Sequence, residues 1–285
     1  MNYSTIRLLS QGFLLLFMSG CATSIAHMQT AKVVKKGSFE GGVGMSMPIA
    51  PSTFERLIDL GESAYAAATA AQNQDKTLSD ADQRDLVEAG LGIIFFSPAP
   101  VTEFWGRYGL FEGVDFGVRW GGARLYVDGR FQFLRDDSDG IDAAVTLGYG
   151  HHSDTGPSFL KSISDVFKTL NIAEYGRKDI ALDLALSRQR GGFGWYGALG
   201  YTLALTEVQT QLSQVEALSD LSQTPLSNQM HVIRAVVGSS LRWKAIWLRA
   251  EFAVARAIIS PTILGTELDL STWQVSPGLA VGFQW

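Results

Sequence analysis

The sequence predicts an all-β fold, a closed antiparallel transmembrane β-barrel of about ten strands, within a range of roughly 8–12. Three observations predict it. Apolar and polar side chains alternate over many segments, these segments are long, and the connections between them are alternately short and long. The hydrophobic fraction is 46%, yet no segment has 18 consecutive apolar residues, so no transmembrane helix is expected.

The alternation is clearest near the carboxy terminus, where one face is apolar and the other is small or polar. The apolar face there carries Trp273, Val275, Leu279, Val281, Phe283 and Trp285. Such a two-residue period is that of a β-strand. In a soluble sandwich the apolar face would point inward, whereas in a membrane barrel it faces lipid and the polar face lines the lumen.

Strand length favours the membrane barrel over the sandwich. Several alternating segments hold for 11 to 14 residues, whereas a globular strand has about 5 or 6 and a tilted membrane strand needs roughly 9–11. The predicted strands are 37–48, 100–110, 113–121, 123–135, 140–151, 178–189, 193–207, 229–243, 245–258 and 272–285. The first pair is the least determined, because residues 92–96 could form a strand instead.

The connections give the predicted barrel a polarity. Four connections on one side are short, and four of the five on the other side are long, as in barrels with short periplasmic turns and long outer loops. The fifth is the tight Gly121-Gly122 turn. The long loops, including the insertion 49–99, contain helical patterns. These helices could form a packed cap, a lid over an apolar ligand path, or an interfacial helix on the membrane.

The amino terminus has the order of a secretory signal: Arg7, an apolar run at 13–18, then small residues. Met18-Ser19-Gly20-Cys21 resembles the bacterial lipobox, whose cysteine is acylated. The resemblance implies a signal peptide at 1–20 and a lipid-anchored tether at 21–36, before the barrel domain at 37–285. It also implies a lipid on Cys21 in the inner leaflet of the outer membrane, with the barrel starting in the periplasm. The alternative is a plain signal peptide and a free or buried thiol.

The region 37–285 resembles bacterial outer-membrane β-barrels, and the stretch from Arg107 to Arg119 looks like paired strands of lipobox-bearing barrel proteins. The resemblance implies an outer-membrane location, with outer-membrane lipids and the barrel-insertion machinery as partners. It also implies that this machinery reads the last strand, through Phe283 and Trp285. The net charge of −5 comes without a basic stripe, so no nucleic-acid partner is expected.

The polar face of the predicted strands carries charges of both signs. The candidates for a lumen charge network are Asp115, Arg119, Arg124, Asp128, Arg130, Asp183, Arg249 and Glu251. Charges enclosed in a narrow interior are tolerated when they pair, which favours a structural network. The alternative is a constriction that sets ion selectivity.

The predicted function is that of a non-enzymatic barrel, structural or a narrow pore, with small-molecule or ion passage left open. His151-His152, with Asp154 and nearby serines, is the one hint of a hydrolase, but adjacent residues of a strand point to opposite faces. No familiar catalytic, phosphate-binding or metal motif occurs, so no catalytic, cofactor or metal residue is predicted. The alternatives are a transporter of a small apolar molecule gated by loop helices, a membrane-embedded hydrolase, and a soluble periplasmic β-protein.

Overall fold

The structure is a computed structural model. It describes residues 24–51, 95–96, 100–121, 124–135, 140–154, 172–210, 226–263 and 266–285. The predicted signal peptide, Cys21 and the predicted loop helices lie outside these residues, apart from Pro51 and Phe95-Phe96. Among the residues that the structure describes, no helix is long and apolar enough to cross a membrane.

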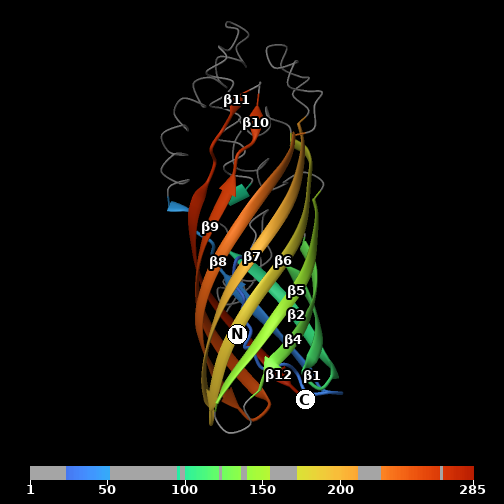
Figure 1. Ribbon diagram of the computed structural model, residues 1–285, viewed down its shortest axis with the longest axis vertical. Helices are drawn as coiled ribbons and strands as arrows, with labels where there is room; N and C mark the ends of the chain where they lie inside the picture. Colours follow the sequence, from blue (N-terminus) through green and yellow to red (C-terminus); the bar gives the residue numbers. More distant parts are fainter. Residues whose placement is uncertain are drawn as a thin grey trace, which may run out of the picture.

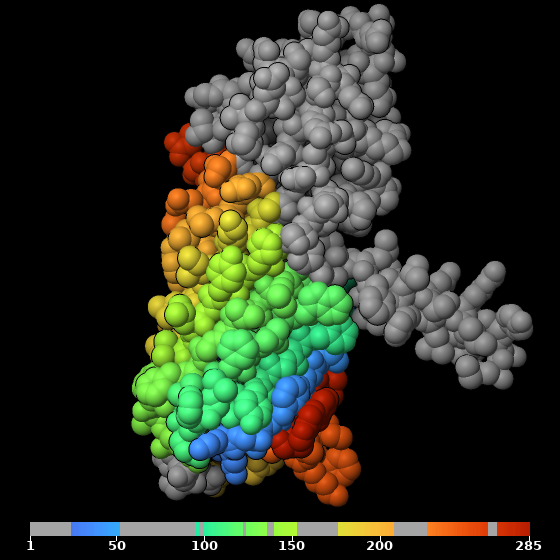
Figure 2. All heavy atoms as spheres, turned by 90° about the vertical axis from the view of Figure 1, so that its right-hand side faces the viewer, coloured from blue at the N-terminus to red at the C-terminus, as the bar shows by residue number. Residues whose placement is uncertain are grey.

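Ten strands form one closed antiparallel barrel (Figure 1). They are β1 (Phe39–Ser46), β2 (Val101–Phe111), β3 (Val114–Gly121), β4 (Arg124–Leu134), β5 (Ile141–Asp154), β6 (Ile172–Arg190), β7 (Phe193–Thr210), β8 (Leu226–Trp243), β9 (Ile246–Ile259) and β12 (Thr272–Gln284). Each strand pairs with the next along the chain, and β1 closes the barrel against β12, with Val43 opposite Val281. Figure 2 shows this seam, with β1 in blue beside β12 in red.

The strand predictions are confirmed for all ten barrel strands, with two differences. The ends of β5, β6, β7 and β8 extend three to six residues beyond the predicted bounds, because their backbone ladders continue where the apolar–polar alternation stops. A short hairpin of β10 (Thr262–Ile263) and β11 (Thr266–Glu267) was not predicted. Phe95 and Phe96 are helical, so they form no strand.

The apolar face of the barrel points outward, which confirms the predicted membrane barrel and not the soluble sandwich. Leu182, Phe131 and Val281 are 51%, 52% and 45% exposed, whereas Asp115 and Asp128 on the inner face are 0% and 2% exposed. In water, such an apolar outer surface would be strongly unfavourable. Hydrocarbon around the barrel removes this cost, and barrel closure pairs every strand edge, as a lipid environment requires.

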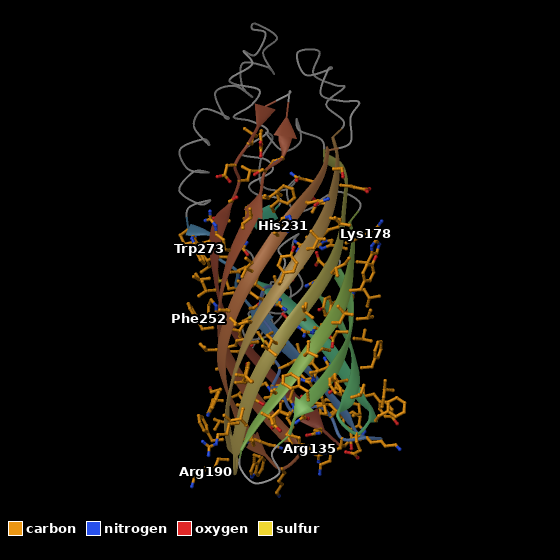
Figure 3. All side chains as sticks on the ribbon, viewed as in Figure 1. Arg135, Lys178, Arg190, His231, Phe252 and Trp273 are labelled. Atoms are coloured by element: carbon orange, nitrogen blue, oxygen red, sulfur yellow. The ribbon has the colours of Figure 1, made fainter. Side chains whose placement is uncertain are left out.

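Outward polar side chains bound this apolar surface at both ends (Figure 3). Lys178, His231 and Trp273 lie at a similar height near the long connections, while Arg135 and Arg190 lie near the opposite end. Phe252, on the outward face of β9, lies between the two groups. This order is typical of a side-chain belt that meets lipid headgroups on each side of the hydrocarbon.

The wall of the barrel is uneven in height. Strands β6, β7 and β8 have 18 or 19 residues, whereas β1 and β3 have eight. In Figure 1 the yellow and orange strands accordingly rise well above the blue and teal ones. The strands join through short turns at one end, such as 112–113 and 191–192, and through long connections at the other, such as 47–100. We call these the short-turn end and the long-connection end.

Candidate functional site

The lumen of the barrel is occupied by residues 24–36, which we call the plug. Its side chains from Ser24 to Gln29 are all buried, and so are those of Ala31, Val33 and Val34. Lys32, Lys35 and Lys36 are exposed. A segment without regular secondary structure must find partners for its backbone groups when it is buried, and here these partners are side chains of the barrel wall.

Four strands around the barrel accept hydrogen bonds from the plug backbone. Glu251 on β9 accepts from His27 N–H at 2.6 Å and from Met28 N–H at 2.5 Å. Further acceptors are Ser187 on β6 for Ala31 N–H at 3.0 Å, Gln132 on β4 for Val33 N–H at 3.1 Å, and Asp115 on β3 for Val34 N–H at 2.8 Å. Because β9, β6 and the neighbouring pair β3 and β4 lie at separate places around the barrel, the plug is held from three directions.

The plug runs from the long-connection end to the short-turn end. Ser24 is hydrogen-bonded to Ser46, the last residue of β1, with 2.9 Å between the hydroxyl oxygens. At the other end Gly37 donates to the carbonyl of Gly109, close to the turn after β2. Gly37 has a φ of +75°, a backbone conformation that glycine adopts without strain. The chain reverses here and enters β1.

This position corrects the expectation of a polar tether for residues 24–36. A tether would lie in solvent outside the barrel, whereas these residues are enclosed by it. The expectation was wrong because the segment has no two-residue period and its polar residues suggested solvent. The polar groups are instead bound by charges on the inner wall.

Small residues of the wall make room for the plug. A Cβ atom at Gly109 would lie 2.0 Å from the backbone oxygen of Lys35, and one at Gly278 would lie 2.3 Å from the Met28 side chain. Real Cβ atoms do not approach other atoms so closely, so the plug could not pass larger side chains there. Glycine inside a strand often marks the close approach of another backbone, which was the available sequence signal for this contact.

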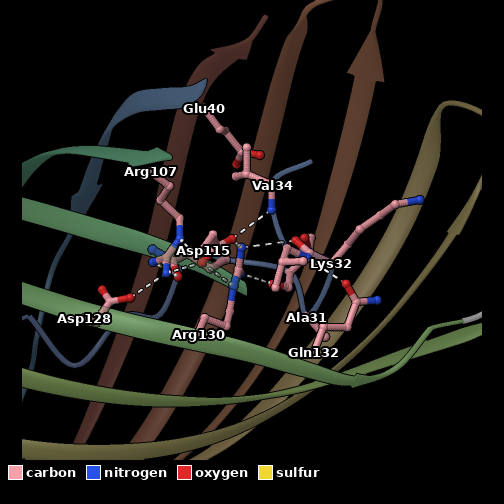
Figure 4. Close-up of polar contacts among 12 residues, drawn as sticks. Ala31, Lys32, Val34, Glu40, Arg107, Asp115, Asp128, Arg130 and Gln132 are labelled. Atoms are coloured by element: carbon pink, nitrogen blue, oxygen red, sulfur yellow. Dashed lines mark hydrogen bonds and ion pairs between the residues drawn. The ribbon is translucent and has the colours of Figure 1, made fainter. Parts of the chain in front are cut away.

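The densest charge cluster lies around Asp115, on β3 (Figure 4). Its carboxylate accepts from Arg107 and from Arg130, with a closest distance of 2.6 Å to each. Arg107 also pairs with Asp128 at 2.6 Å. Arg130 continues to the plug, where it donates to the carbonyls of Thr30 and Lys32. Arg107 likewise donates to the side-chain oxygen of Gln29 at 2.9 Å. The cluster therefore joins three strands and the plug.

A second cluster joins β1 and β9 to the plug. Arg249 donates to the carbonyl of Met28 at 2.9 Å and to Glu40 at 2.8 Å, and it stacks on Trp247 with its guanidinium 3.8 Å from the ring centroid. Glu251, two residues on, has no arginine partner in the described part of the chain. Its partners are the two plug N–H groups and the hydroxyl of Tyr196 at 3.0 Å.

The remaining predicted lumen residues also face the interior. Asp183 pairs with Arg234 at 2.6 Å, Arg124 pairs with Asp179 at 2.8 Å, and Arg119 lies 3.8 Å from Asp128. Eight predicted charges thus line the lumen in three groups: the Asp115 cluster, the Arg249 cluster, and the pairs nearer the long connections. The prediction missed the plug as a partner of the first two groups.

At the carboxy terminus, Phe283 and Trp285 stack at 4.5 Å between ring centroids, and both are exposed at the outer surface. Their recognition by the insertion machinery stays a prediction.

The two histidines of the hydrolase alternative lie on β5. His151 is exposed and His152 is 3% exposed, so the two point to opposite faces, as predicted. His152 faces the lumen between Arg124 and Arg177 of the adjacent strands. The side chains of Ser153, Ser158 and Asp154 lie outside the described part. Within that part, no group of three or more histidine, cysteine, aspartate or glutamate residues could hold a metal ion.

The long-connection end of the lumen is also filled. Phe95 and Phe96, from the connection between β1 and β2, are buried in one apolar cluster with Ile25 of the plug and Met230 of β8. A cavity of about 20 Å³ is left among these residues. That is room for about one water molecule, so the described residues are closely packed at this end of the lumen.

Comparisons with known proteins bear on the fold alone. No family model matches the chain, and no curated protein does. The solved structures that resemble it include the outer-membrane protease OmpT of Escherichia coli (7% identity, 90% of this chain and 99% of that chain, TM-score 0.38). They also include Neisserial surface protein A (9% identity, 86% and 96%, TM-score 0.31) and Ail of Yersinia pestis (8% identity, 88% and 99%, TM-score 0.30). At such low similarity, none of them indicates what this chain does.

Proposed function

We propose that this chain is an outer-membrane β-barrel closed by its own amino-terminal segment, with a structural and non-enzymatic role. The observation that carries the proposal is the plug, whose backbone is hydrogen-bonded to four strands of the wall. The outward apolar surface and the short turns at one end support a bacterial outer membrane, with the short-turn end in the periplasm. A narrow pore is the less favoured function.

We infer a closed lumen because the plug occupies it. The interior of an eight-stranded barrel is filled by its own side chains, and ten strands enclose a wider space. In this chain many inward wall residues are small, such as Ala181, Ala185, Ala253 and Ala255. The plug fills the space that these residues leave. The wall and the plug therefore complement each other in volume and in charge.

Planar-bilayer conductance tests this closure. The wild-type protein should show no steady conductance, whereas a variant lacking residues 24–34 should show a stable open level. Gly109→Ala should open the lumen intermittently, because its Cβ would clash with the backbone at Lys35. Slower migration of each protein after boiling, in a denaturing gel, verifies that the barrel has folded.

The matched control is Glu112→Gln with Arg135→Gln. It removes an ion pair of 3.0 Å whose side chains are 75% and 45% exposed at a short turn, away from the lumen. This control should remain silent. Steady conductance of the wild type, or equal conductance with and without the plug, would contradict the proposal.

The direction of the plug is tested by cross-linking. Cysteines at positions 24 and 46 should form a disulfide, because the serine hydroxyls are 2.9 Å apart. The matched control pairs position 24 with position 240, which lies at the short-turn end. Both pairs are made in a Cys21→Ser background. Cross-linking of the control pair instead would show that the plug enters from the opposite side.

We also propose that Cys21 is acylated, on the lipobox resemblance. Cys21 precedes Ser24 by three residues, which span at most about 11 Å. Since Ser24 lies at the long-connection end, the lipid would meet the membrane in the outer leaflet. The earlier expectation placed it in the inner leaflet. Labelling with a radioactive fatty acid should succeed in the wild type and fail in Cys21→Ser; labelling of both would refute acylation at this residue.

A further inference from the structure

A polar cavity of about 320 Å³ opens at the short-turn end of the lumen. The plug forms part of its lining through Thr30, Lys32, Val33 and Lys35, and the ends of β1, β5, β6, β8, β9 and β12 form the rest. This volume lies in the range of small-molecule sites, which begins at roughly 300 Å³. Because the cavity lies between the buried part of the plug and the short-turn end, it is reached from the short-turn end.

The side chains that line this cavity carry five positive and two negative charges. Its cations are Lys32, Lys35, Arg188, Arg242 and Arg249, and its carboxylates are Glu40 and Asp142. Both carboxylates are already engaged, Glu40 by Arg249 at 2.8 Å and Asp142 by Gln132 at 2.7 Å. Within the described residues, neither Lys32 nor Lys35 has an ion-pair partner. The cavity therefore offers the positive charges of Lys32 and Lys35, which its own acidic side chains do not pair with.

Two buried N–H donors in the lining also lack an acceptor among the residues that the structure describes. These are Nε of Arg249 and the indole N–H of Trp247, on residues that are 5% and 3% exposed. A buried donor without a partner is costly, and both donors lie in the wall behind the cavity surface. Arginine and lysine together with N–H donors are the groups that bind phosphate and other oxyanions.

We propose that the cavity binds a phosphate group, carried either by a soluble molecule or by a lipid of the inner leaflet. The bound group lies between Lys32 and Lys35 of the plug and Arg242 and Arg249 of the wall. It would thus join the plug to the barrel at the short-turn end. A ligand that binds only the assembled site also stabilises it by mass action.

The test uses the folded full-length protein in zwitterionic detergent, titrated with pyrophosphate and with inorganic phosphate in a calorimeter. We expect both anions to bind, and we expect pyrophosphate to bind more tightly than inorganic phosphate. Lys32→Gln with Lys35→Gln should weaken binding about tenfold, and Arg242→Gln about threefold. The matched control, Lys178→Gln, removes an exposed cation at the opposite end of the barrel and should change binding less than twofold.

A second arm distinguishes the two sources of phosphate. The protein is placed in bilayer discs of phosphatidylcholine, with or without phosphatidylglycerol, and the titration is repeated. If pyrophosphate binds in detergent and in both kinds of disc, the ligand is a soluble molecule. If pyrophosphate binding is lost only in the discs that contain phosphatidylglycerol, the ligand is the lipid. No binding in detergent, or equal loss in the control and in the lysine variant, would overturn the proposal. Conductance is a separate measurement, so closure of the lumen can fail without affecting this result.

Discussion

Two buried carboxylates of the barrel, Asp115 and Asp183, show what separates the plug-binding part of the lumen from the rest. Both are on the inner wall and are at most 1% exposed. Asp183 pairs with Arg234, across from β6 to β8. Asp115 pairs with two arginines and also accepts the N–H of Val34. The first carboxylate joins wall to wall, whereas the second joins wall to plug.

Similar buried charges therefore serve two purposes in this lumen. A wall-to-wall pair neutralises charge and ties two strands together, which any closed barrel with an ionic interior needs. A wall-to-plug contact orients a segment that has no regular structure of its own. Substitutions at the two kinds of position should therefore differ in conductance even where they agree in stability.

The largest effect is expected for Asp115→Ala. It leaves Arg107 and Arg130 without their shared carboxylate in a buried site, which should lower the free energy of unfolding by about 3–5 kcal/mol. It also releases the plug at Val34, so intermittent conductance should appear. Urea unfolding followed by tryptophan fluorescence and planar-bilayer recording measure the two effects. A destabilised barrel that stays silent would mean that Asp115 does not hold the plug.

Asp183→Ala should have the next largest effect. It leaves Arg234 unpaired, and the free energy of unfolding should fall by about 3 kcal/mol, the lower end of the range for a broken buried pair. The smaller cost follows from the loss of one arginine partner rather than two. Conductance should remain absent, because the carboxylate has no hydrogen bond to the plug within the described residues. Openings like those of Asp115→Ala would break the comparison between the two carboxylates.

The barrel wall could be predicted from sequence because the membrane imposes a pattern on it. Lipid outside and polar groups inside force each strand into strict alternation over its spanning length, as in Leu182 between Ala181 and Asp183. Outside the lipid this constraint ends, and the predicted strand bounds end where the alternation ends. The upper parts of β6 and β8, from Ile172 and Leu226, are strands without the alternation.

The plug could not be predicted in the same way, since its contacts follow no period. Its backbone N–H groups are bound by residues as distant in sequence as Glu251 and Ser187. One signal was present nevertheless. Gly109 and Gly278 are glycines inside strands, which often mark the close approach of another segment. This signal does not identify residues 24–36 as that segment.

The smallest expected change in the free energy of unfolding concerns two serines, whose substitution compares the two kinds of contact without any change of charge. Ser187 accepts the N–H of Ala31 in the plug at 3.0 Å, whereas Ser240 donates to Gln189 within the wall at 3.4 Å. Both side chains are buried, at 3% and 4% exposed. Ser187→Ala leaves a buried N–H without a partner and should cost about 1–2 kcal/mol, while Ser240→Ala should cost less than about 1 kcal/mol.

Hydrogen exchange at the Ala31 amide is the sharper measurement for this pair. The exchange should accelerate in Ser187→Ala, because the amide loses its acceptor and the plug opens locally more often. It should stay at the wild-type rate in Ser240→Ala, whose lost contact lies within the wall. Equal acceleration in both would mean that the plug responds to the stability of the whole barrel. The distinction between wall-to-wall and wall-to-plug contacts would then have no energetic basis.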